Sequence, residues 1–280
     1  MRWGRDGMRV AGVLVDFGID LADAMLGRSC PGCGGAAPRG RPICDGCDAR
    51  VPRTGSALCL RCMQERGGPT VGEPASPASA STSTSRSGCA RHGAERLLLA
   101  GPPYEPPLDR VMHAFKYAGA REAFGWIADL LPEPPGRGTS VWREYVLVPV
   151  PLHPARRTWR GFDQAKLLAE TAGSRWGIPA VDALRRRLDH PPQARLGADG
   201  RRENARGAFT LTGRGARLLA SRPVLLVDDV ATTGSTLLEA AAALEPAGPS
   251  WILSLAASHG GLPGGAEPAS SASVAGDGRV

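Results

Sequence analysis

Two adjacent carboxylates, Asp228 and Asp229, stand between an apolar segment and a loop rich in hydroxyl groups. The apolar segment, residues 224–227, is all Val or Leu, which is typical of a strand buried on both faces in a parallel sheet. The loop leads into an Ala- and Leu-rich helix that we expect from about Leu237. Backbone N–H groups of such a loop, at a helix N-terminus, suit a phosphate. The loop residues are Ala231, Thr232, Thr233, Gly234, Ser235 and Thr236.

The two carboxylates suit a different part of the same ligand. They repel a phosphate, but they are good hydrogen-bond acceptors for neighbouring hydroxyl groups. A phosphate site beside a diol site describes a ribose 5-phosphate. The alternative, a buried strand followed by an Asp N-cap and a Thr-rich turn, explains one acidic residue and one hydroxyl but not the whole string. A Walker-type nucleotide loop is a poor match, because no Lys follows Gly234.

A second apolar segment, residues 146–151, ends in prolines and precedes Arg156, Arg157 and Arg160. A helix is expected after these arginines, to about Trp176. Ligands of open α/β sheets bind outside the carboxyl ends of the strands, so we expect the three arginines to face a second phosphate group. An ordinary solvated loop is the alternative. Lys116, between two expected helices, is either a phosphate contact or a solvated residue.

Residues 185–206 form a third basic stretch, interrupted by prolines and glycines. We expect a lid that carries cations and closes over a pyrophosphate while excluding water. A solvated surface loop and a nucleic-acid contact loop are the alternatives. The stretch lacks aromatic residues that could stack on bases before Phe209, which weakens the nucleic-acid alternative there.

The seven cysteines indicate metal binding. Six of them form three C-x2-C pairs, and the seventh has a histidine at the same spacing. Eight such ligands suffice for two tetrahedral zinc sites, which would be closed and structural. Sequential and interleaved pairings are both open. The ligands are Cys30, Cys33, Cys44, Cys47, Cys59, Cys62, Cys89 and His92.

The overall composition bears on the partners, the location and the domain organisation of the protein. The 280 residues carry a formal net charge of +7, which favours anionic partners. No apolar run approaches the roughly twenty residues that a membrane span needs, and we expect a cytoplasmic protein. The expected divisions are an amphipathic helix within 1–27, a zinc-binding module at 28–93 with a disordered insert at about 63–88, a main domain at 104–258 and a disordered tail at 259–280.

The order of motifs resembles that of a known family. After the cysteine pairs come Tyr-Ala-Gly at 117–119, Val-Pro-Val-Pro at 148–151, Arg-Gly-Phe-Asp-Gln at 160–164, Gln-x-x-Leu at 193–196, Arg-x-x-Asn at 201–204 and the acidic pair. This order resembles the ComF family of phosphoribosyltransferase-like proteins, known for natural competence and DNA uptake. The resemblance covers most of residues 30–256.

The resemblance implies a type I phosphoribosyltransferase-like α/β fold, with a parallel sheet flanked by helices and a small N-terminal zinc-ribbon module. It also implies binding of phosphoribosyl pyrophosphate with Mg²⁺, and one or two structural Zn²⁺ ions. Asp228 and Asp229 would hold the ribose hydroxyls, and the flexible segment would include Gln193 and Arg201. Asp163 stands where the family usually has Asn, and His92 stands in for a cysteine.

Three functional hypotheses remain. The first is a phosphoribosyltransferase that acts on an unknown acceptor and is linked to DNA uptake or natural competence. The second is a non-catalytic competence factor that binds single-stranded DNA and partners in the competence machinery. The third is a sensor that binds the ribose phosphate without turning it over.

Overall fold

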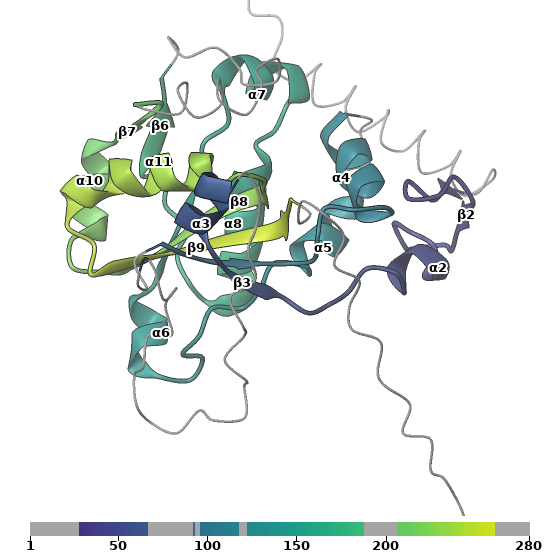
Figure 1. Cartoon of the computed structure of the whole chain (residues 1–280), viewed down its shortest axis with the longest axis horizontal. Helices are drawn as coiled ribbons and strands as arrows, with labels where there is room; N and C mark the ends of the chain where they lie inside the picture. The colour runs from purple at the N-terminus through teal and green to yellow at the C-terminus, as the bar shows by residue number, and fades with distance from the viewer. Residues whose placement is uncertain (1–27, 67–91, 93–95, 118–121, 188–206, 261–280) are drawn as a thin grey trace, which may run out of the picture.

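The computed structural model describes residues 28–66, 92, 96–117, 122–187 and 207–260 (Figure 1). The helix predicted within 1–27, most of the predicted insert, the predicted tail after residue 260 and residues 188–206 of the basic segment 185–206 lie outside the described residues. So do three of the predicted site residues, Cys89, Gln193 and Arg201.

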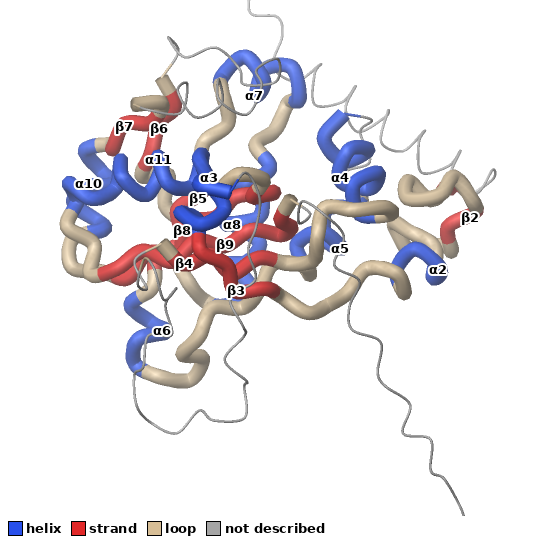
Figure 2. Tube along the Cα trace, in the orientation of Figure 1, coloured by secondary structure: helices blue, strands red, loops and turns tan. Residues whose placement is uncertain are grey.

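A five-stranded sheet forms the centre of the molecule (Figure 2). Its strands are, in spatial order, β3 (Ser56–Cys59), β4 (Leu97–Ala100), β9 (Trp251–His259), β8 (Pro223–Ala231) and β5 (Val146–Pro149). All neighbouring pairs are parallel except β3 and β4, which are antiparallel. The sheet is therefore mixed, and the prediction of a parallel sheet was wrong for the edge strand β3.

The apolar run in β8 is buried on both faces, as its composition predicts. Leu225 and Val227 belong to one hydrophobic core, whereas Val224 and Leu226 belong to the other. All four are fully buried. Because both neighbours of β8 are parallel to it, the carboxyl ends of β5, β8 and β9 meet at one edge of the sheet, which is where the predicted ligand residues begin.

Helices cover both faces of the sheet (Figure 1). The elements that contribute to the first core include α4 (Leu108–Tyr117), α5 (Ala123–Ala128), α6 (Ser140–Glu144) and α8 (Gln164–Trp176). The elements that cover the sheet on the side of the second core include α3 (Leu60–Arg66), the antiparallel pair β6 (Leu184–Arg186) and β7 (Phe209–Leu211), α10 (Gly213–Leu219), α11 (Ser235–Leu244) and the short helix η3 (Glu245–Ala247).

The N-terminal elements form a small module beside α4 and α5. It contains the antiparallel pair β1 (Arg28–Ser29) and β2 (Ala36–Ala37), followed by α2 (Asp45–Asp48). The Trp126 indole donates to Asp48 Oδ1 at 2.7 Å, and Arg110 Nη1 donates to the Gly32 carbonyl at 3.3 Å. These two bonds attach the module to α5 and α4.

Three boundaries differ from the predictions. Residues 63–66, assigned to the disordered insert, form the end of α3, in which Met63 is fully buried. His259, assigned to the tail, is the buried last residue of β9. β3 and α3, assigned to the zinc-binding module, are part of the central sheet and of its second core. The reason is that β3 pairs with β4, which is distant in sequence, and local patterns do not reveal such pairing.

Gly101 is a position where the fold leaves no room for a side chain. It follows β4 at the edge of the sheet, and a Cβ there would lie 2.2 Å from the Ala257 carbonyl oxygen and 2.5 Å from the Leu130 carbonyl oxygen. Both atoms belong to backbone, so the chain must shift. We expect Gly101→Ala to lower the free energy of unfolding by about 2 kcal/mol, measured by urea denaturation.

Gly125→Ala is the matched control, because a Cβ at Gly125 within α5 would meet no atom within 4 Å. Alanine is the better helix former, so this variant should be stabilised by about 0.5–1 kcal/mol. Equal denaturation midpoints for the two variants would contradict the tight packing at Gly101.

Candidate functional site

The acidic pair directly follows the apolar run of β8, and both carboxylates are half-buried. Asp229 Oδ2 lies 2.7 Å from Lys116 Nζ, which reaches it from the end of α4. Asp228 lies within electrostatic range of Arg186, on β6 of the other layer. The pair therefore receives positive charge from both layers of the fold.

Repulsion and burial dominate the chemistry of Asp228. Burial, reinforced by the adjacent charge of Asp229, raises the pKa of Asp228 to about 8. The Asp229 N–H, which donates to Asp228 Oδ1 at 2.8 Å, and the charge of Lys116 offset only part of this rise. A cation beside Asp228 would relieve the repulsion, and carboxylate oxygens are ligands that Mg²⁺ accepts. The acidic pair therefore fits a divalent cation.

Lys116 is an internal partner of the acidic pair. Burial alone would lower its pKa, but the facing carboxylate of Asp229 more than compensates, and the pKa of Lys116 is raised. The lysine therefore stays charged. The sequence spacing could have predicted that Lys116 faces the protein interior. Leu108, Met112 and Lys116 are separated by four residues each, so they share one side of α4.

The hydroxyl-rich loop connects β8 to α11. Ala231 is still in the strand and accepts from the Gly260 N–H at 2.8 Å, whereas Ser235 is the first residue of the helix. The loop proper is therefore Thr232–Gly234, at the N-terminus of a ten-residue helix. Thr232 is exposed, Thr233 and Thr236 are half-buried, and the Thr233 and Ser235 hydroxyl oxygens lie 3.0 Å apart. No carboxylate belongs to these residues, which keeps the loop suitable for an anion.

Gly234 connects this loop to the metal-ligating region. Its φ of +73° is left-handed, and a Cβ there would lie 3.0 Å from Leu60 Cδ2 and 3.1 Å from the Leu60 carbonyl oxygen. Leu60 lies between Cys59 and Cys62 in the sequence. The turn that carries these two cysteines therefore packs directly against the hydroxyl-rich loop.

The segment after β5 carries the predicted arginines on α7 (Pro154–Arg160). Asp163 joins the two ends of this segment, because its Oδ2 accepts from the Leu152 N–H at 2.9 Å and its Oδ1 accepts from the Lys166 N–H at 3.3 Å. Asp163 is thus the N-cap of α8. Asn is usual at this position in the family that the sequence resembles. The Asp163 carboxylate accepts hydrogen bonds from backbone N–H groups, and the amide oxygen of Asn can also act as such an N-cap acceptor.

The three arginines of α7 differ in their surroundings. Arg160 donates to the Tyr117 hydroxyl at 2.7 Å and to Gln164 Oε1 at 3.1 Å, so it is engaged within the protein. Among the described residues, Arg156 and Arg157 have no ion-pair partner. These two are the available cations of the segment.

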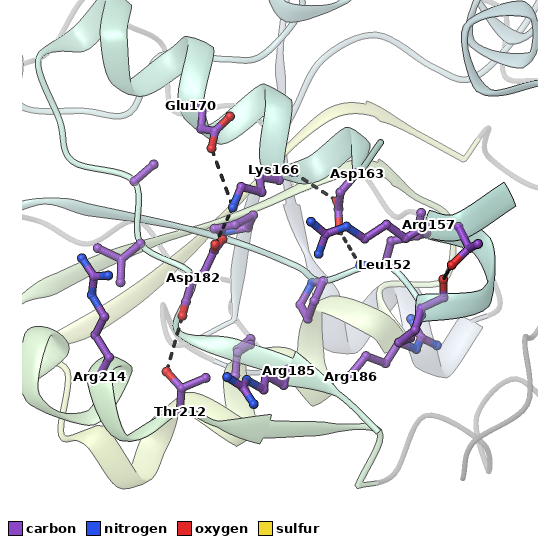
Figure 3. Close-up of a pocket in the computed structure, with 17 residues that line it drawn as sticks. Leu152, Arg157, Asp163, Lys166, Glu170, Asp182, Arg185, Arg186, Thr212 and Arg214 are labelled. Atoms are coloured by element: carbon purple, nitrogen blue, oxygen red, sulfur yellow. Dashed lines mark hydrogen bonds and ion pairs between the residues drawn. The ribbon is translucent and has the colours of Figure 1, made fainter. Parts of the chain in front are cut away.

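A groove of about 700 Å³ lies beside the same segment (Figure 3). Lys166, within it, pairs with Asp182 and lies 3.8 Å from Glu170. Arg157, Arg185 and Arg214 also line it and have no carboxylate partner in the part of the chain that the structure describes. The groove does not include Asp228 or Asp229, so it is a separate cationic surface next to the acidic pair.

The cysteines form two groups, each composed of sequence neighbours. Cys33 Sγ and Cys44 Sγ lie 3.7 Å apart. The ligand atoms within each group all lie within 4.8 Å of one another, which is close enough to hold one metal ion. Four thiolates, or thiolates with an imidazole, are the donors that zinc prefers. The groups are Cys30, Cys33, Cys44 and Cys47, and Cys59, Cys62 and His92, which is the sequential pairing.

The second group has an orienting carboxylate that the sequence analysis missed. His92 Nδ1 lies 3.6 Å from Cys59 Sγ and 3.5 Å from Cys62 Sγ, so this nitrogen faces the metal position. The other ring nitrogen, Nε2, lies 3.1 Å from Glu65 Oε1. A carboxylate at this place fixes the orientation of a ligating histidine. The sequence could have indicated this carboxylate, because Glu65 lies one helical turn after Cys62 in α3.

Comparisons with known proteins agree with this geometry. The family described as "Phosphoribosyl transferase domain" matches residues 175–271, which include β8, the hydroxyl-rich loop and α11. "DNA utilization protein YhgH" of Salmonella typhi is 30% identical over 216 residues, covering 71% of this chain and 82% of that protein. The protein of the same name from Escherichia coli O157:H7 is 30% identical over 218 residues, covering 76% and 82%.

A further relative matches over a shorter region. "Competence protein F" of Haemophilus influenzae is 37% identical over 134 residues, covering 47% of this chain. The match spans about half of that relative, 52% of its length. Separately, no helix among the described residues has both the length and the apolar character to cross a membrane.

The raised pKa of Asp228 predicts a pH-dependent stability. The folded chain holds the Asp228 proton up to about pH 8, whereas the ordinary value is 3.8, so the stability from this group is present at acid pH and is lost as the pH rises through that range. We expect Asp228→Asn, which cannot ionise, to raise Tm by about 2–4 °C near pH 8, or about 1 kcal/mol, and hardly at all near pH 4.5. Scanning calorimetry without added Mg²⁺ measures this.

Asp129→Asn is the control, because Asp129 is 54% exposed and pairs with Arg175 at the surface. It should not change Tm in a pH-dependent way. If Asp228→Asn raised Tm by the same amount at both pH values, ionisation of Asp228 would not be the cause of the increase.

Proposed function

The chain belongs to the ComF family of phosphoribosyltransferase-like proteins, and we propose that it binds phosphoribosyl pyrophosphate with Mg²⁺ and transfers the phosphoribosyl group to an acceptor. One observation carries the proposal. At the carboxyl edge of the sheet, an acidic pair adjoins an uncharged loop at a helix N-terminus, and two available arginines follow the neighbouring strand. A ligand with a diol between a phosphate and a pyrophosphate matches this spatial arrangement of an uncharged loop, an acidic pair and two arginines.

Each part has a defined task in binding. The backbone N–H groups of Thr232–Gly234 and the first turn of α11 hold the 5-phosphate, with the hydroxyls of Thr233, Ser235 and Thr236. Asp228 and Asp229 accept hydrogen bonds from the ribose hydroxyls. Lys116 keeps Asp229 fixed in position, because the 2.7 Å ion pair is half-buried. Arg156 and Arg157 bind the pyrophosphate.

Catalysis follows from where the charge develops. When the bond from the anomeric carbon to the pyrophosphate oxygen breaks, positive charge grows on the sugar and negative charge on the departing pyrophosphate. Asp228 and Asp229 stabilise the first, and Arg156 and Arg157 stabilise the second, without a covalent step on the enzyme. Asp228 and Asp229 would hold Mg²⁺, which adds positive charge beside the pyrophosphate oxygens when bound.

The two cysteine groups have a structural role in this proposal. Each holds one Zn²⁺ with no position left for a reacting water, when Cys89 completes the second set. The turn of Cys59 and Cys62 supports the phosphate-binding loop through the contact between Leu60 and Gly234. Metal binding therefore stabilises the N-terminal module and also the loop that binds the 5-phosphate.

One observation favours a second candidate function, binding of single-stranded DNA. The groove beside α7 presents Arg157, Arg185 and Arg214 to solvent without carboxylate partners among the described residues, as a polyanion would require (Figure 3). The names of the relatives refer to competence and DNA utilization, so we extend the proposal to a cytoplasmic role in DNA uptake. A ribose-phosphate sensor is the third candidate, and it differs by releasing no pyrophosphate.

Asp229→Asn distinguishes these functions. It removes the negative charge of Asp229 and replaces one of its two acceptor oxygens by an NH2 donor, so Lys116 loses its ionic partner. We therefore expect the affinity for phosphoribosyl pyrophosphate to fall at least about 10-fold in calorimetry with Mg²⁺. Asp182→Asn, a change of the same kind at a residue of the cationic groove, should bind phosphoribosyl pyrophosphate like the unchanged protein.

Each of the three candidate functions predicts a different result. Unchanged binding in Asp229→Asn would sink the ribose-phosphate proposal. Binding of a single-stranded oligonucleotide that falls steeply with salt and is unaffected by Asp229→Asn would instead favour the DNA-binding function. Ligand binding without pyrophosphate release, across a panel of acceptors, would favour the sensor.

Cys59→Ser tests the structural zinc. The first cysteine group is untouched, so we expect the metal content, measured by atomic emission, to fall from about two zinc ions per chain to about one. Because the contact with Gly234 loses its support, we also expect Tm to fall by at least about 5 °C. Arg61→Ala is the control, since Arg61 is exposed in the same turn and contributes no ligand atom. Unchanged zinc content in Cys59→Ser would refute the assignment of the second site.

A further inference from the structure

The cationic groove beside α7 is a cavity with a lining of its own. Its volume of about 700 Å³ lies in the range of cavities that hold small-molecule ligands. Pro149, Pro151 and Pro154, at and after the end of β5, supply apolar atoms to it. Neither carboxylate of the acidic pair lines it, so the groove is separate from the proposed ribose-phosphate site.

Three arginines from three different elements surround the groove (Figure 3). Arg157 comes from α7, Arg185 from β6 and Arg214 from α10, and all three are exposed. Within the described part of the chain, none of them has a carboxylate at ion-pair distance. Like charges that share a cavity without a counter-charge repel one another, so an anion that enters the groove is stabilised.

The carboxylates of the groove are engaged away from these arginines. Asp182 pairs with Lys166, and Glu170 Oε1 lies 3.8 Å from the Lys166 ammonium nitrogen. Asp163 accepts hydrogen bonds from the backbone N–H groups of Leu152 and Lys166. These contacts use the negative charges of the groove and leave its three arginines available for a ligand.

Packing of α10 against β6 fixes the position of Arg214. The Thr212 N–H donates to the Ala183 carbonyl oxygen at 2.8 Å, and a Cβ at Gly215 would lie 2.7 Å from the same oxygen. Glycine therefore allows the first turn of α10 to touch the chain just before β6. This contact brings Arg214 to the groove that Arg185 of β6 also lines.

The side chains of the groove indicate the chemical class of its ligand. A guanidinium group donates two parallel hydrogen bonds to a phosphate, which makes arginine a selective phosphate ligand. Because the arginines come from three elements, a ligand with several linked phosphates can contact more than one of them. None of the 17 described residues that line the groove is aromatic, so no ring is present there to stack on a base.

We propose that the cationic groove is a binding site for a compact oligophosphate, either inorganic or the phosphate chain of a nucleoside triphosphate. The site does not depend on the proposed function, because it uses none of the acidic pair or the hydroxyl-rich loop. Single-stranded DNA would use the same arginines. The compact ligand fits better, because a long strand would pass the three carboxylates of the groove and would find no ring on which to stack.

The groove adjoins the ribose-phosphate site closely enough for the two ligands to influence each other. Arg157 lines the groove and follows Arg156 on α7. Arg186 also lines it and lies within electrostatic range of Asp228. An anion in the groove competes for these positive charges, so we expect both ligands to bind at once and each to weaken the other by about 5-fold.

The test is calorimetry on the full-length, zinc-loaded protein at low salt. We expect sodium tripolyphosphate to bind with one molecule per chain. ATP should bind with an affinity within about 3-fold of that value, because no ring of the lining contacts its base. The tripolyphosphate titration is then repeated with saturating phosphoribosyl pyrophosphate at constant free Mg²⁺, and binding should persist.

Variants assign the binding to the groove. Arg214→Ala should weaken tripolyphosphate binding about 5-fold, whereas Asp182→Asn, which removes a negative charge from the groove, should strengthen it about 3-fold. Arg217→Ala is the matched control, because Arg217 is exposed on the same helix and does not line the groove. It loses the same charge and should leave the affinity unchanged. None of the three variants should change the affinity for phosphoribosyl pyrophosphate.

Four results would overturn the inference. They are the absence of tripolyphosphate binding, an equal loss of affinity in Arg214→Ala and Arg217→Ala, binding of ATP alone, and loss of tripolyphosphate binding when phosphoribosyl pyrophosphate is bound. If only a single-stranded oligonucleotide binds and Arg214→Ala weakens it, the groove is a nucleic-acid contact and the inference is again wrong. If phosphoribosyl pyrophosphate does not bind but tripolyphosphate shows the expected pattern, the proposed function fails and this inference stands.

Discussion

Repulsion between two adjacent carboxylates is the constraint around which this fold is arranged. Asp228 and Asp229 lie half-buried at the end of a strand whose preceding residues are fully buried, so water cannot screen them well. Lys116 neutralises one of them, and the other has a pKa raised to about 8. The end of α4 must therefore stay against β8. The N-terminal module helps to hold it there, through the bonds from Arg110 to Gly32 and from Trp126 to Asp48.

The contact between Gly234 and Leu60 gives the cysteine groups a place in the same arrangement. A loop that binds phosphate through backbone N–H groups must keep one conformation, and a left-handed residue in it is easily displaced. Here the turn between Cys59 and Cys62 packs against that residue, within the second hydrophobic core. β3 lies in the central sheet and α3 packs in its second core, so the second cysteine group adjoins the hydroxyl-rich loop. The first group belongs to the module that is bonded to α4, the helix that carries Lys116.

Local sequence patterns predicted the strands and helices that carry the candidate site. They did not predict features that depend on contacts between segments distant in sequence. The run at 224–227 and the helix ending at Trp176 were confirmed, because burial on both faces and helical spacing leave direct traces in sequence. The pairing of β3 with β4 was not predicted, since it joins segments separated by the insert. The same holds for single side chains: Asp228 was evident from its neighbours, but the partners of Lys116 and Arg160 come from distant elements.

The three arginines of α7 show why residue type alone does not assign a role. All three were expected to face pyrophosphate, because all follow a buried strand at the ligand edge. Helical geometry separates only Arg157, because Arg156 and Arg160 are four residues apart and share one face of α7. The local partners make the remaining difference: Arg160 bonds to Tyr117, while Arg156 and Arg157 have no ion-pair partner among the described residues. An arginine has five N–H donors, and Arg160 uses one on each terminal nitrogen for the Tyr117 hydroxyl and for Gln164. Arg160 therefore ties the Tyr117 ring at the end of α4 to Gln164 of α8, a role that its place beside two other arginines in the sequence does not reveal.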